Sequence, residues 1–314
     1  MTRIAVIGTG QMGANHARVA SRTNGIELVA VVDVDQEKRH ALATAFGTLE
    51  FATVSDLLNR TKLDAAVVAT PTKYHHAVVE ELLAAGVHVL VEKPIALTVE
   101  EGEDLQHKAE AAKLVLQVGH VERFNPAVRE LLSIVDHPIH LDIVRSGPFS
   151  PRVLDNVVVD LMIHDLDLAR KIAGSEVSKM RSITQATRSD SADLAVALLT
   201  FENGVTASVT ASRIGQQKIR EISVTQPDSV VVADLIRQDV NIHRMQQFEF
   251  LSGEGARYRQ SGVVEIPFIE NRGEPLMEQL RSFAESIRTG AEPAVTATDG
   301  TIALALAHRV FLGK

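Results

Sequence analysis

Gly8-Thr9-Gly10-Gln11-Met12-Gly13 is the most informative stretch of this chain, and its neighbours explain why. It follows Arg3-Ile4-Ala5-Val6-Ile7, a short apolar run rich in β-branched residues that is typical of a buried parallel strand. Residues 11–22 contain no proline and carry apolar side chains at helical spacing. The sequence therefore predicts a strand, a glycine-rich turn and a helix in direct succession.

This arrangement is typical of a Rossmann dinucleotide site, in which the helix N-terminus receives a pyrophosphate. One glycine makes the turn, one lets the backbone approach the ligand, and one packs helix against strand. A second predicted strand, residues 26–32, ends at Asp33, where a ribose-binding acid is expected. We predict a nicotinamide cofactor bound by Gly8, Gly10, Gln11, Met12, Gly13 and Asp33.

The acids around the ribose position bear on which cofactor is used. Asp33 and Asp35 would repel a 2′-phosphate, and no arginine follows at once, so we expect NAD rather than NADP. Lys38 and Arg39 lie a few residues on and could serve a 2′-phosphate, so NADP stays open as the less favoured alternative.

Composition limits the class of protein. With 314 residues and 45% hydrophobic content, the chain can bury a full core and is long enough for two domains. A net charge of −8 without a long basic run argues against a nucleic-acid partner. The absence of cysteine excludes disulfides and thiolate chemistry. We expect no signal peptide, no membrane span and a cytoplasmic location.

The pattern of elements predicts an α/β chain of two domains. Residues 1–120 alternate apolar strands with amphipathic helices, which predicts a doubly wound parallel sheet that binds NAD. Thr98 and Glu101 have the spacing of a capping box for the helix after Pro94. Residues 121–314 read mainly as strands, among them one over residues 240–244, with one long helix over residues 157–173 and an Asn203-Gly204 hairpin signal. We predict an α+β domain with a large, mostly antiparallel open sheet. The C-terminal helices could pack back on the first domain.

Two turns in the first domain carry polar side chains where predicted strands end. Thr70-Pro71 and His75 follow one strand, and Glu92-Lys93-Pro94 follows the next. Ligands of open parallel sheets lie beyond the carboxyl ends of the strands, so we expect these residues at the cofactor. Lys93 could hydrogen-bond a hydroxyl during its oxidation, and a cis peptide bond before Pro94 could place it. Solvated roles for His75 and for the Glu92-Lys93 pair are the alternatives.

A third cluster lies on the long predicted helix. Asp160 and His164 are one turn apart, so the carboxylate could orient the imidazole as a general base. A structural role at a helix N-terminus is the alternative. No H-E-x-x-H set or comparable group of ligands indicates a metal.

Together these motifs resemble the Gfo/Idh/MocA family of nicotinamide-dependent sugar oxidoreductases over essentially the whole chain. The markers are Gly8–Gly13, Asp33, Thr70-Pro71, Glu92-Lys93-Pro94, Asp160 through His164, and Asp299-Gly300. The resemblance implies that Lys93, Asp160 and His164 match the catalytic trio, with His164 as the acid/base. It also implies that residues 121–314 bind the substrate and form a homodimer or homotetramer through the outer face of their sheet.

The segment from Val118 to Pro126 is similar to that of family members that oxidise C3 of UDP-N-acetylglucosamine, and the likeness places Arg123 near the nicotinamide. Arg213, Lys218 and Arg220 could face a substrate diphosphate, or could be a basic strand edge. The leading hypothesis is an NAD-dependent dehydrogenase of a UDP-amino sugar. A free polyol or hexose dehydrogenase and a non-catalytic NAD-binding sensor are the alternatives.

Overall fold

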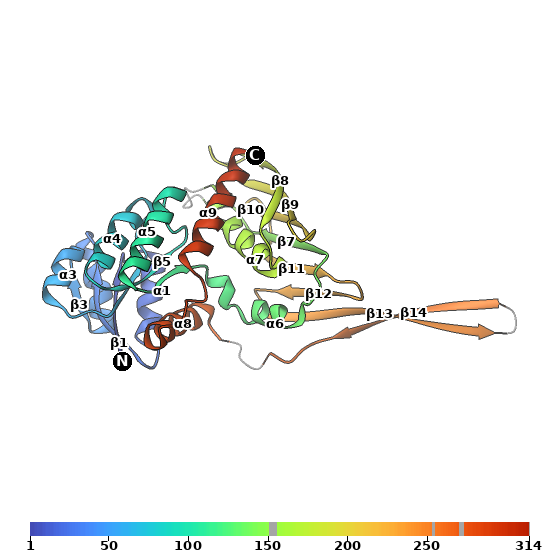
Figure 1. Cartoon of the computed structure of the whole chain (residues 1–314), viewed down its shortest axis with the longest axis horizontal. Helices are drawn as coiled ribbons and strands as arrows, with labels where there is room; N and C mark the ends of the chain where they lie inside the picture. The colour runs from blue at the N-terminus through green and yellow to red at the C-terminus, as the bar shows by residue number, and fades with distance from the viewer. Residues whose placement is uncertain (151–155, 253–254, 270–272, 314) are drawn as a thin grey trace. The chain divides into compact units, whose positions relative to one another are not determined.

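The computed structural model of the chain describes residues 1–150, 156–252, 255–269 and 273–313 (Figure 1). These residues form two compact units. The first contains Met1–Phe124 and Glu274–Ala305, and the second contains Asn125–Gly273 and Leu306–Lys314. The first unit is thus built from two separate stretches of chain.

The first unit is organised around a parallel six-stranded sheet of order β3-β2-β1-β4-β5-β6. This is the strand order of a dinucleotide-binding Rossmann fold, so the predicted fold class is confirmed for this unit. Its central strands carry the uninterrupted apolar runs that a sheet covered on both faces requires. The strands are β1 (Thr2–Ile7), β2 (Ile26–Val32), β3 (Leu49–Phe51), β4 (Ala65–Val68), β5 (His88–Glu92) and β6 (Leu116–Gly119).

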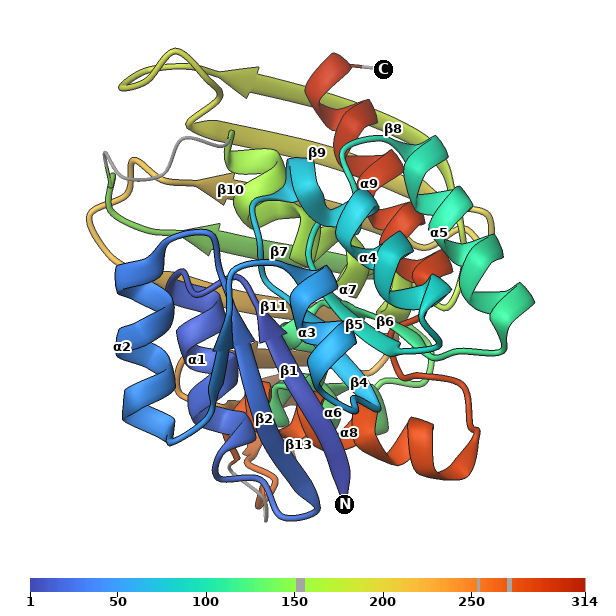
Figure 2. The ribbon, with the colours of Figure 1, turned by 90° about the vertical axis from the view of Figure 1, so that its left-hand side faces the viewer.

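Helices cover both faces of this sheet (Figure 2). Helices α3 (Val54–Arg60), α4 (His75–Ala84) and α5 (Val99–Ala112) pack on one face. The other face is covered by α1 (Gln11–Ala20), α2 (Gln36–Phe46) and α8 (Pro275–Thr289). The helix α9 (Ala297–Leu312) adds Ala297 and Leu304 to the first of these cores. Short 3-10 turns lie at Thr72–Tyr74 and Val121–Phe124.

The start of α5 shows how the sequence sets these helices. Thr98 accepts a hydrogen bond from the amide of Glu101, and the carboxylate of Glu101 accepts one from the amide of Thr98. This reciprocal capping box satisfies amides that the first helical turn leaves without a carbonyl partner. The capping box predicted from the sequence is therefore confirmed.

The second unit contains an eight-stranded sheet of order β14-β13-β12-β11-β7-β10-β9-β8. Strands β7 and β10 run parallel and the other neighbouring pairs run antiparallel, which confirms the mostly antiparallel sheet. The Asn203-Gly204 turn joins β9 to β10, as predicted. The strands are β7 (His140–Ser146), β8 (Val177–Gln185), β9 (Leu194–Phe201), β10 (Thr206–Ser212), β11 (Ile219–Thr225), β12 (Ser229–Asp234), β13 (Asp239–Ser252) and β14 (Gly255–Glu265).

Two features of this unit differ from the sequence prediction. Strand β13 runs on past residue 244 and pairs with β14 in a long ribbon that extends beyond the other strands of the sheet (Figure 1). The predicted helix over residues 157–173 begins as a π-helical turn, Val158–Met162, and continues as α7 (Ile163–Ala173). The remaining helix, α6, spans Pro126–Ile134.

Within the described part of the chain, no helix is both long enough and apolar enough to cross a lipid bilayer.

Candidate active site

The glycine-rich turn between β1 and α1 has the features of a phosphate cradle. A Cβ added to Gly8 would lie 2.6 Å from the carbonyl oxygen of Ala69, and one added to Gly13 would lie 1.8 Å from that of Gly8. A Cβ added to Gly10 would meet nothing within 4 Å. Gly8 and Gly13 are therefore required by the fold itself. Gly10 is not, and it leaves open space at the N-terminus of α1, as an approaching pyrophosphate requires.

Asp33 is tied to this turn from the end of β2. Its Oδ2 accepts hydrogen bonds from the amide of Thr9 at 2.7 Å and the hydroxyl of Thr9 at 2.8 Å. Its Oδ1 accepts one from the amide of Asp35 at 2.9 Å. Burial raises the pKa of Asp33, but these donors outweigh it and hold the pKa below its usual range. The residue is an ionised acceptor with lone pairs left for a ribose diol.

His75 links the two turns that follow β4 and β5. Its Nδ1 lies 2.8 Å from the carbonyl oxygen of Pro94, and its Nε2 lies 2.8 Å from that of Thr70. The side chain is 1% exposed, and burial lowers its pKa despite the two carbonyls. With both ring nitrogens facing backbone carbonyls, His75 braces these two turns, and its contact with the cofactor stays a prediction.

A buried pair, His16 and Glu92, anchors the turn at Glu92-Lys93-Pro94. His16 Nε2 on α1 lies 2.6 Å from Glu92 Oε1, and the Lys93 amide donates to Glu92 Oε2 at 3.3 Å. Burial raises the pKa of Glu92, but the hydrogen bond and charge of His16 and the proximity of Lys93 outweigh burial. The pKa is therefore below its usual range and the carboxylate is ionised. The Lys93-Pro94 bond is cis, as the sequence suggested. Glu92 thus supports the half-buried Lys93.

Arg123 is held inside the first unit. It is buried in the turn after β6, and its Nη2 lies 3.4 Å from Asp299 Oδ1. Asp299 also takes part in a reciprocal cap at the start of α9: Thr296 Oγ1 accepts a hydrogen bond from the Asp299 amide, and Asp299 Oδ2 accepts one from the Thr296 amide. The prediction that Arg123 binds the cofactor directly gains no support from this pairing, which gives the guanidinium a partner on α9.

The helix with Asp160 and His164 begins at a well-capped end in the second unit. Asn156 Oδ1 accepts hydrogen bonds from the amides of Val158 and Val159, each at 3.0 Å. Asp160 lies in the π-helical turn and His164 at the start of α7, and both side chains are half-buried. The predicted α-helical spacing is therefore replaced by a wider turn, a local geometry that is frequent at functional sites.

Comparison with known proteins agrees with these features. Residues 2–120 match the "Oxidoreductase family, NAD-binding Rossmann fold", and residues 146–226 match the "GFO/IDH/MocA C-terminal domain". The chain is 36% identical over 243 residues to a UDP-N-acetylglucosamine 3-dehydrogenase of Acidithiobacillus ferrooxidans, which covers 77% of this chain and 76% of that protein. The chain belongs to the Gfo/Idh/MocA family.

Other members of the family extend the comparison. A solved structure of a UDP-N-acetylglucosamine 3-dehydrogenase from Acidithiobacillus ferrooxidans superposes with a TM-score of 0.88 and 31% identity, over 99% of this chain and 96% of that chain. A myo-inositol 2-dehydrogenase of Thermotoga maritima is 26% identical and covers 98% of this chain and 94% of that protein. The chain is thus an oxidoreductase with a NAD-binding fold, related to enzymes named for two kinds of substrate.

Packing explains why Asp299-Gly300, one of the markers of the Gfo/Idh/MocA pattern, stands at the start of α9. A Cβ on Gly300 would lie 2.6 Å from a methyl group of Val118 on β6. Asp299 hydrogen-bonds reciprocally with Thr296, which caps α9, and pairs with Arg123. The Asp299-Gly300 pair therefore seats α9 against the end of β6.

The basic residues Arg213, Lys218 and Arg220, which could face a substrate diphosphate, lie in different environments. Arg213 is buried and its Nε donates to Asp193 Oδ1 at 2.7 Å, so this guanidinium serves the protein interior and not a substrate diphosphate. Lys218 is exposed and Arg220 is half-buried. The sequence shows the charge of Arg213 but not the acid that pairs with it in the fold.

Sequence reasoning also passed over supporting residues. His16 is not among the predicted site residues, although a histidine on a buried helix face suggests a partner. Thr9 donates a hydrogen bond to Asp33, and Asn156 accepts hydrogen bonds from helix amides. The sequence signal for both is a short polar residue at a turn or at the start of a helix. Among the described residues, no group of three or more histidines or acids could hold a metal ion.

Proposed function

We propose that this protein is an NAD-dependent dehydrogenase that oxidises a secondary hydroxyl of a sugar, at C3 of a UDP-N-acetyl-hexosamine. The observation that carries the cofactor part is the open space at Gly10 between two glycines that the fold itself requires. The turns that end β4 and β5 lie at the same edge of the sheet as this cradle, because all six strands are parallel.

The ribose end of the cradle supports NAD over NADP. The half-buried carboxylate of Asp33 is ionised and would repel a 2′-phosphate. The nearby cations are engaged elsewhere: Lys38 pairs with Asp35 at 2.8 Å, and Arg39 Nη1 donates to the backbone carbonyl of Asp33 at 3.2 Å. A 2′-phosphate would have to recruit these side chains from their present partners.

The reaction assigns separate tasks to the residues of the chain. NAD held by the Gly8–Gly13 turn and Asp33 would supply the hydride acceptor for the carbon that bears the hydroxyl. Lys93 donates a hydrogen bond to that oxygen and stabilises its developing negative charge, while the hydroxyl proton passes to the imidazole of His164. Asp160 orients this imidazole. The C–H and O–H bonds break, a C=O bond forms, and NADH and one proton balance the step.

The nucleotide-sugar assignment is supported by the 36% identity to an enzyme named for UDP-N-acetylglucosamine. Relatives named for inositol favour a free polyol as the second candidate, because one of them aligns with 98% of this chain. With Arg213 turned into the interior, a diphosphate site would use Lys218 and Arg220 or other donors.

The outer face of the second sheet supports a homo-oligomer. Ile183 on β8 is 68% exposed and Leu198 on β9 is 56% exposed, and both point away from the covered face of the sheet. Exposed apolar residues on neighbouring strands are typical of a surface that a partner covers. We propose that a second copy of this chain covers it.

The direct test is NADH formation with NAD and UDP-N-acetylglucosamine, UDP-glucose, myo-inositol or glucose, in the presence of a carbonyl trap. Activity confined to the UDP-sugars would support the proposal. Activity confined to the free polyol or hexose would replace it with the second candidate. NAD binding without turnover of any compound would favour the sensor alternative. Lys93→Ala, which should bind NAD but not turn over, is the matched control.

A further inference from the structure

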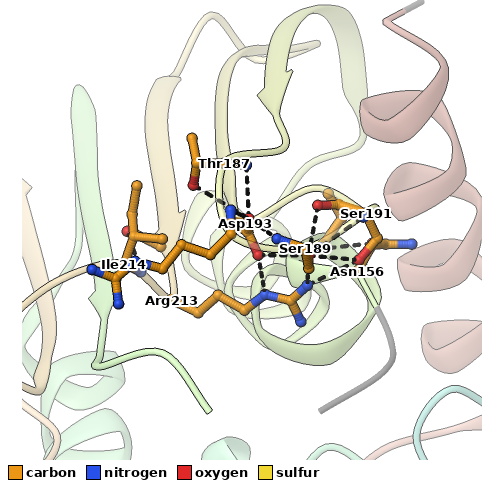
Figure 3. Close-up of polar contacts among 10 residues, drawn as sticks. Asn156, Thr187, Ser189, Ser191, Asp193, Arg213 and Ile214 are labelled. Atoms are coloured by element: carbon orange, nitrogen blue, oxygen red, sulfur yellow. Dashed lines mark hydrogen bonds and ion pairs between the residues drawn. The ribbon is translucent and has the colours of Figure 1, made fainter. Parts of the chain in front are cut away.

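A buried ion pair in the second unit ties several segments together (Figure 3). Asp193 at the start of β9 is 0% exposed, and Arg213 just after β10 is 4% exposed. Arg213 Nε donates to Asp193 Oδ1 at 2.7 Å, and the amide of Arg213 donates to the carbonyl of Asp193 at 2.9 Å. Removing either partner would leave a buried charge uncompensated.

The carboxylate of Asp193 organises the loop that precedes it. Its Oδ2 accepts hydrogen bonds from the amides of Thr187, Arg188 and Ser189, at 2.8, 2.6 and 3.1 Å. Burial raises the pKa of Asp193, but the amides of Arg188 and Thr187, then Arg213 and the Ser189 hydroxyl, outweigh it and hold the pKa far below its usual range. The acid is a permanent anion around which the loop is folded.

The guanidinium of Arg213 closes the loop from its other side. Its Nη2 donates to Ser189 Oγ at 2.8 Å and to Ser191 Oγ at 2.9 Å, while Ser189 Oγ also reaches Asp193 Oδ1 at 2.8 Å. Figure 3 shows these side chains converging on the Asp193 carboxylate. One ion pair therefore fixes residues 187–191 at both ends.

This loop contacts the start of the helix that carries Asp160 and His164. The carbonyl of Ala192, next to Asp193, accepts a hydrogen bond from the amide of Val157 at 2.9 Å. Val157 lies beside Asn156, whose side chain caps the amides of the first turn. The backbone of Asn156 also accepts from the amide of Asp160 at 3.0 Å. The path from the ion pair to Asp160 is continuous and lies within one unit.

We propose that Asp193 and Arg213 are positioning residues, which set the first turn of this helix and through it the orientation of Asp160 and His164. The inference rests on the proposed function, since the orientation of Asp160 and His164 matters for catalysis only if Asp160 and His164 act on the substrate. Mispositioning of a catalytic group by about 1 Å can reduce turnover by roughly a hundredfold. A small change at the pair should therefore affect the rate more than it affects cofactor binding.

Arg213→Lys tests this directly. It keeps the charge, but one ammonium cannot replace the planar guanidinium that reaches Asp193, Ser189 and Ser191 together. We expect kcat to fall about tenfold or more, KM for NAD to change less than about twofold, and the pH profile of kcat to shift. Val231→Ala, a buried change on β12 away from this path, is the control for general destabilisation and should keep the wild-type pH profile.

A second readout works without turnover. In protein labelled at the histidine imidazoles, the His164 resonance is assigned by its loss in His164→Gln, and its titration is followed by NMR. We expect its pKa to move in Arg213→Lys and to stay in Val231→Ala. An unmoved His164 pKa together with an unshifted pH profile would overturn the inference, as would equal shifts in both variants.

This readout also separates the inference from the proposed function. If the wild type oxidises none of the sugars but the His164 titration responds to Arg213→Lys alone, the positioning path stands and the proposed function fails. If Arg213→Lys does not fold, Ser191→Ala removes a single contact of the same guanidinium. Ser191→Ala should then shift the pKa of His164 away from its wild-type value. An unchanged His164 pKa in Ser191→Ala would contradict the positioning path.

Discussion

Gly10→Ala should separate cofactor binding from stability. The position has φ −67° and ψ −168°, which alanine adopts without strain, and the added methyl group would meet nothing within 4 Å. Reducing the freedom of the unfolded chain stabilises the variant by about 0.4–1 kcal/mol, while alanine is a poorer N-cap than glycine by a similar amount. We expect the free energy of unfolding to change by less than about 1 kcal/mol.

The affinity for NAD should respond quite differently. The methyl group occupies the space through which the pyrophosphate approaches the first amides of α1. We expect the Kd for NAD to rise at least about tenfold, which corresponds to about 1.4 kcal/mol. Calorimetric titration with NAD measures this change, and thermal unfolding without NAD measures the stability of the same sample.

Gly13→Ala is the contrasting variant. Its methyl group would lie 1.8 Å from the carbonyl oxygen of Gly8, so backbone atoms must move by more than an ångström. Overpacking of this kind costs about 1–3 kcal/mol or more, and 3 kcal/mol lowers Tm by about 6–12 °C in a unit of this size. Wild-type NAD affinity in Gly10→Ala, or equal losses of Tm in the two variants, would refute the assignment of the cradle.

Four further outcomes are expected. Lys93→Ala should bind NAD normally and lower turnover about a hundredfold or more, because the lost group acts in the transition state; unchanged turnover would remove Lys93 from the mechanism. Asp33→Ala should weaken NAD binding in calorimetry without lowering saturated turnover comparably, and unaltered affinity would contradict the ribose assignment. Because the pKa of Asp193 is depressed in the folded state, its contribution to stability is complete above its ordinary pKa of about 4 and is lost as pH falls below that value. In urea unfolding, the free energy of unfolding should therefore decrease less steeply with falling pH in Arg213→Lys than in the wild type. Leu198→Asp should reduce the mass measured by light scattering, whereas an unaltered mass, or a monomeric wild type, would argue against this face as the interface.

The sequence could predict the first unit because its signals are local. The glycine turn, the apolar strands and the Thr98-Glu101 box each depend on residues close together in the chain. Strand β3 was missed because Leu49-Glu50-Phe51 is too short to show a period. The candidate residues Asp33 and Lys93 could be placed at one sheet edge because parallel strands end there together.

The remaining features depend on partners distant in sequence. The β13–β14 ribbon was predicted only as far as residue 244, because apolar and polar residues alternate in its outer part only over short stretches such as Phe248-Glu249-Phe250. A π-helical turn differs from an α-helical one by its hydrogen bonds, to which side-chain spacing is insensitive. Arg213 could be interpreted as a phosphate ligand or as part of a basic strand edge, because its charge is visible in the sequence and its pairing with Asp193 is not.

The two-part composition of the first unit has a consequence for how the protein is made. Leu276, Leu280 and Phe283 on α8 cover one face of the parallel sheet, yet they are synthesised after the whole of residues 125–273. Helices α1 and α2 are made early and cover part of that face, but translation at about 5–20 residues per second leaves the part under α8 uncovered on the ribosome for roughly 7–30 seconds. During this interval the nascent sheet presents apolar surface, and chaperone binding to it should end when α8 emerges and docks.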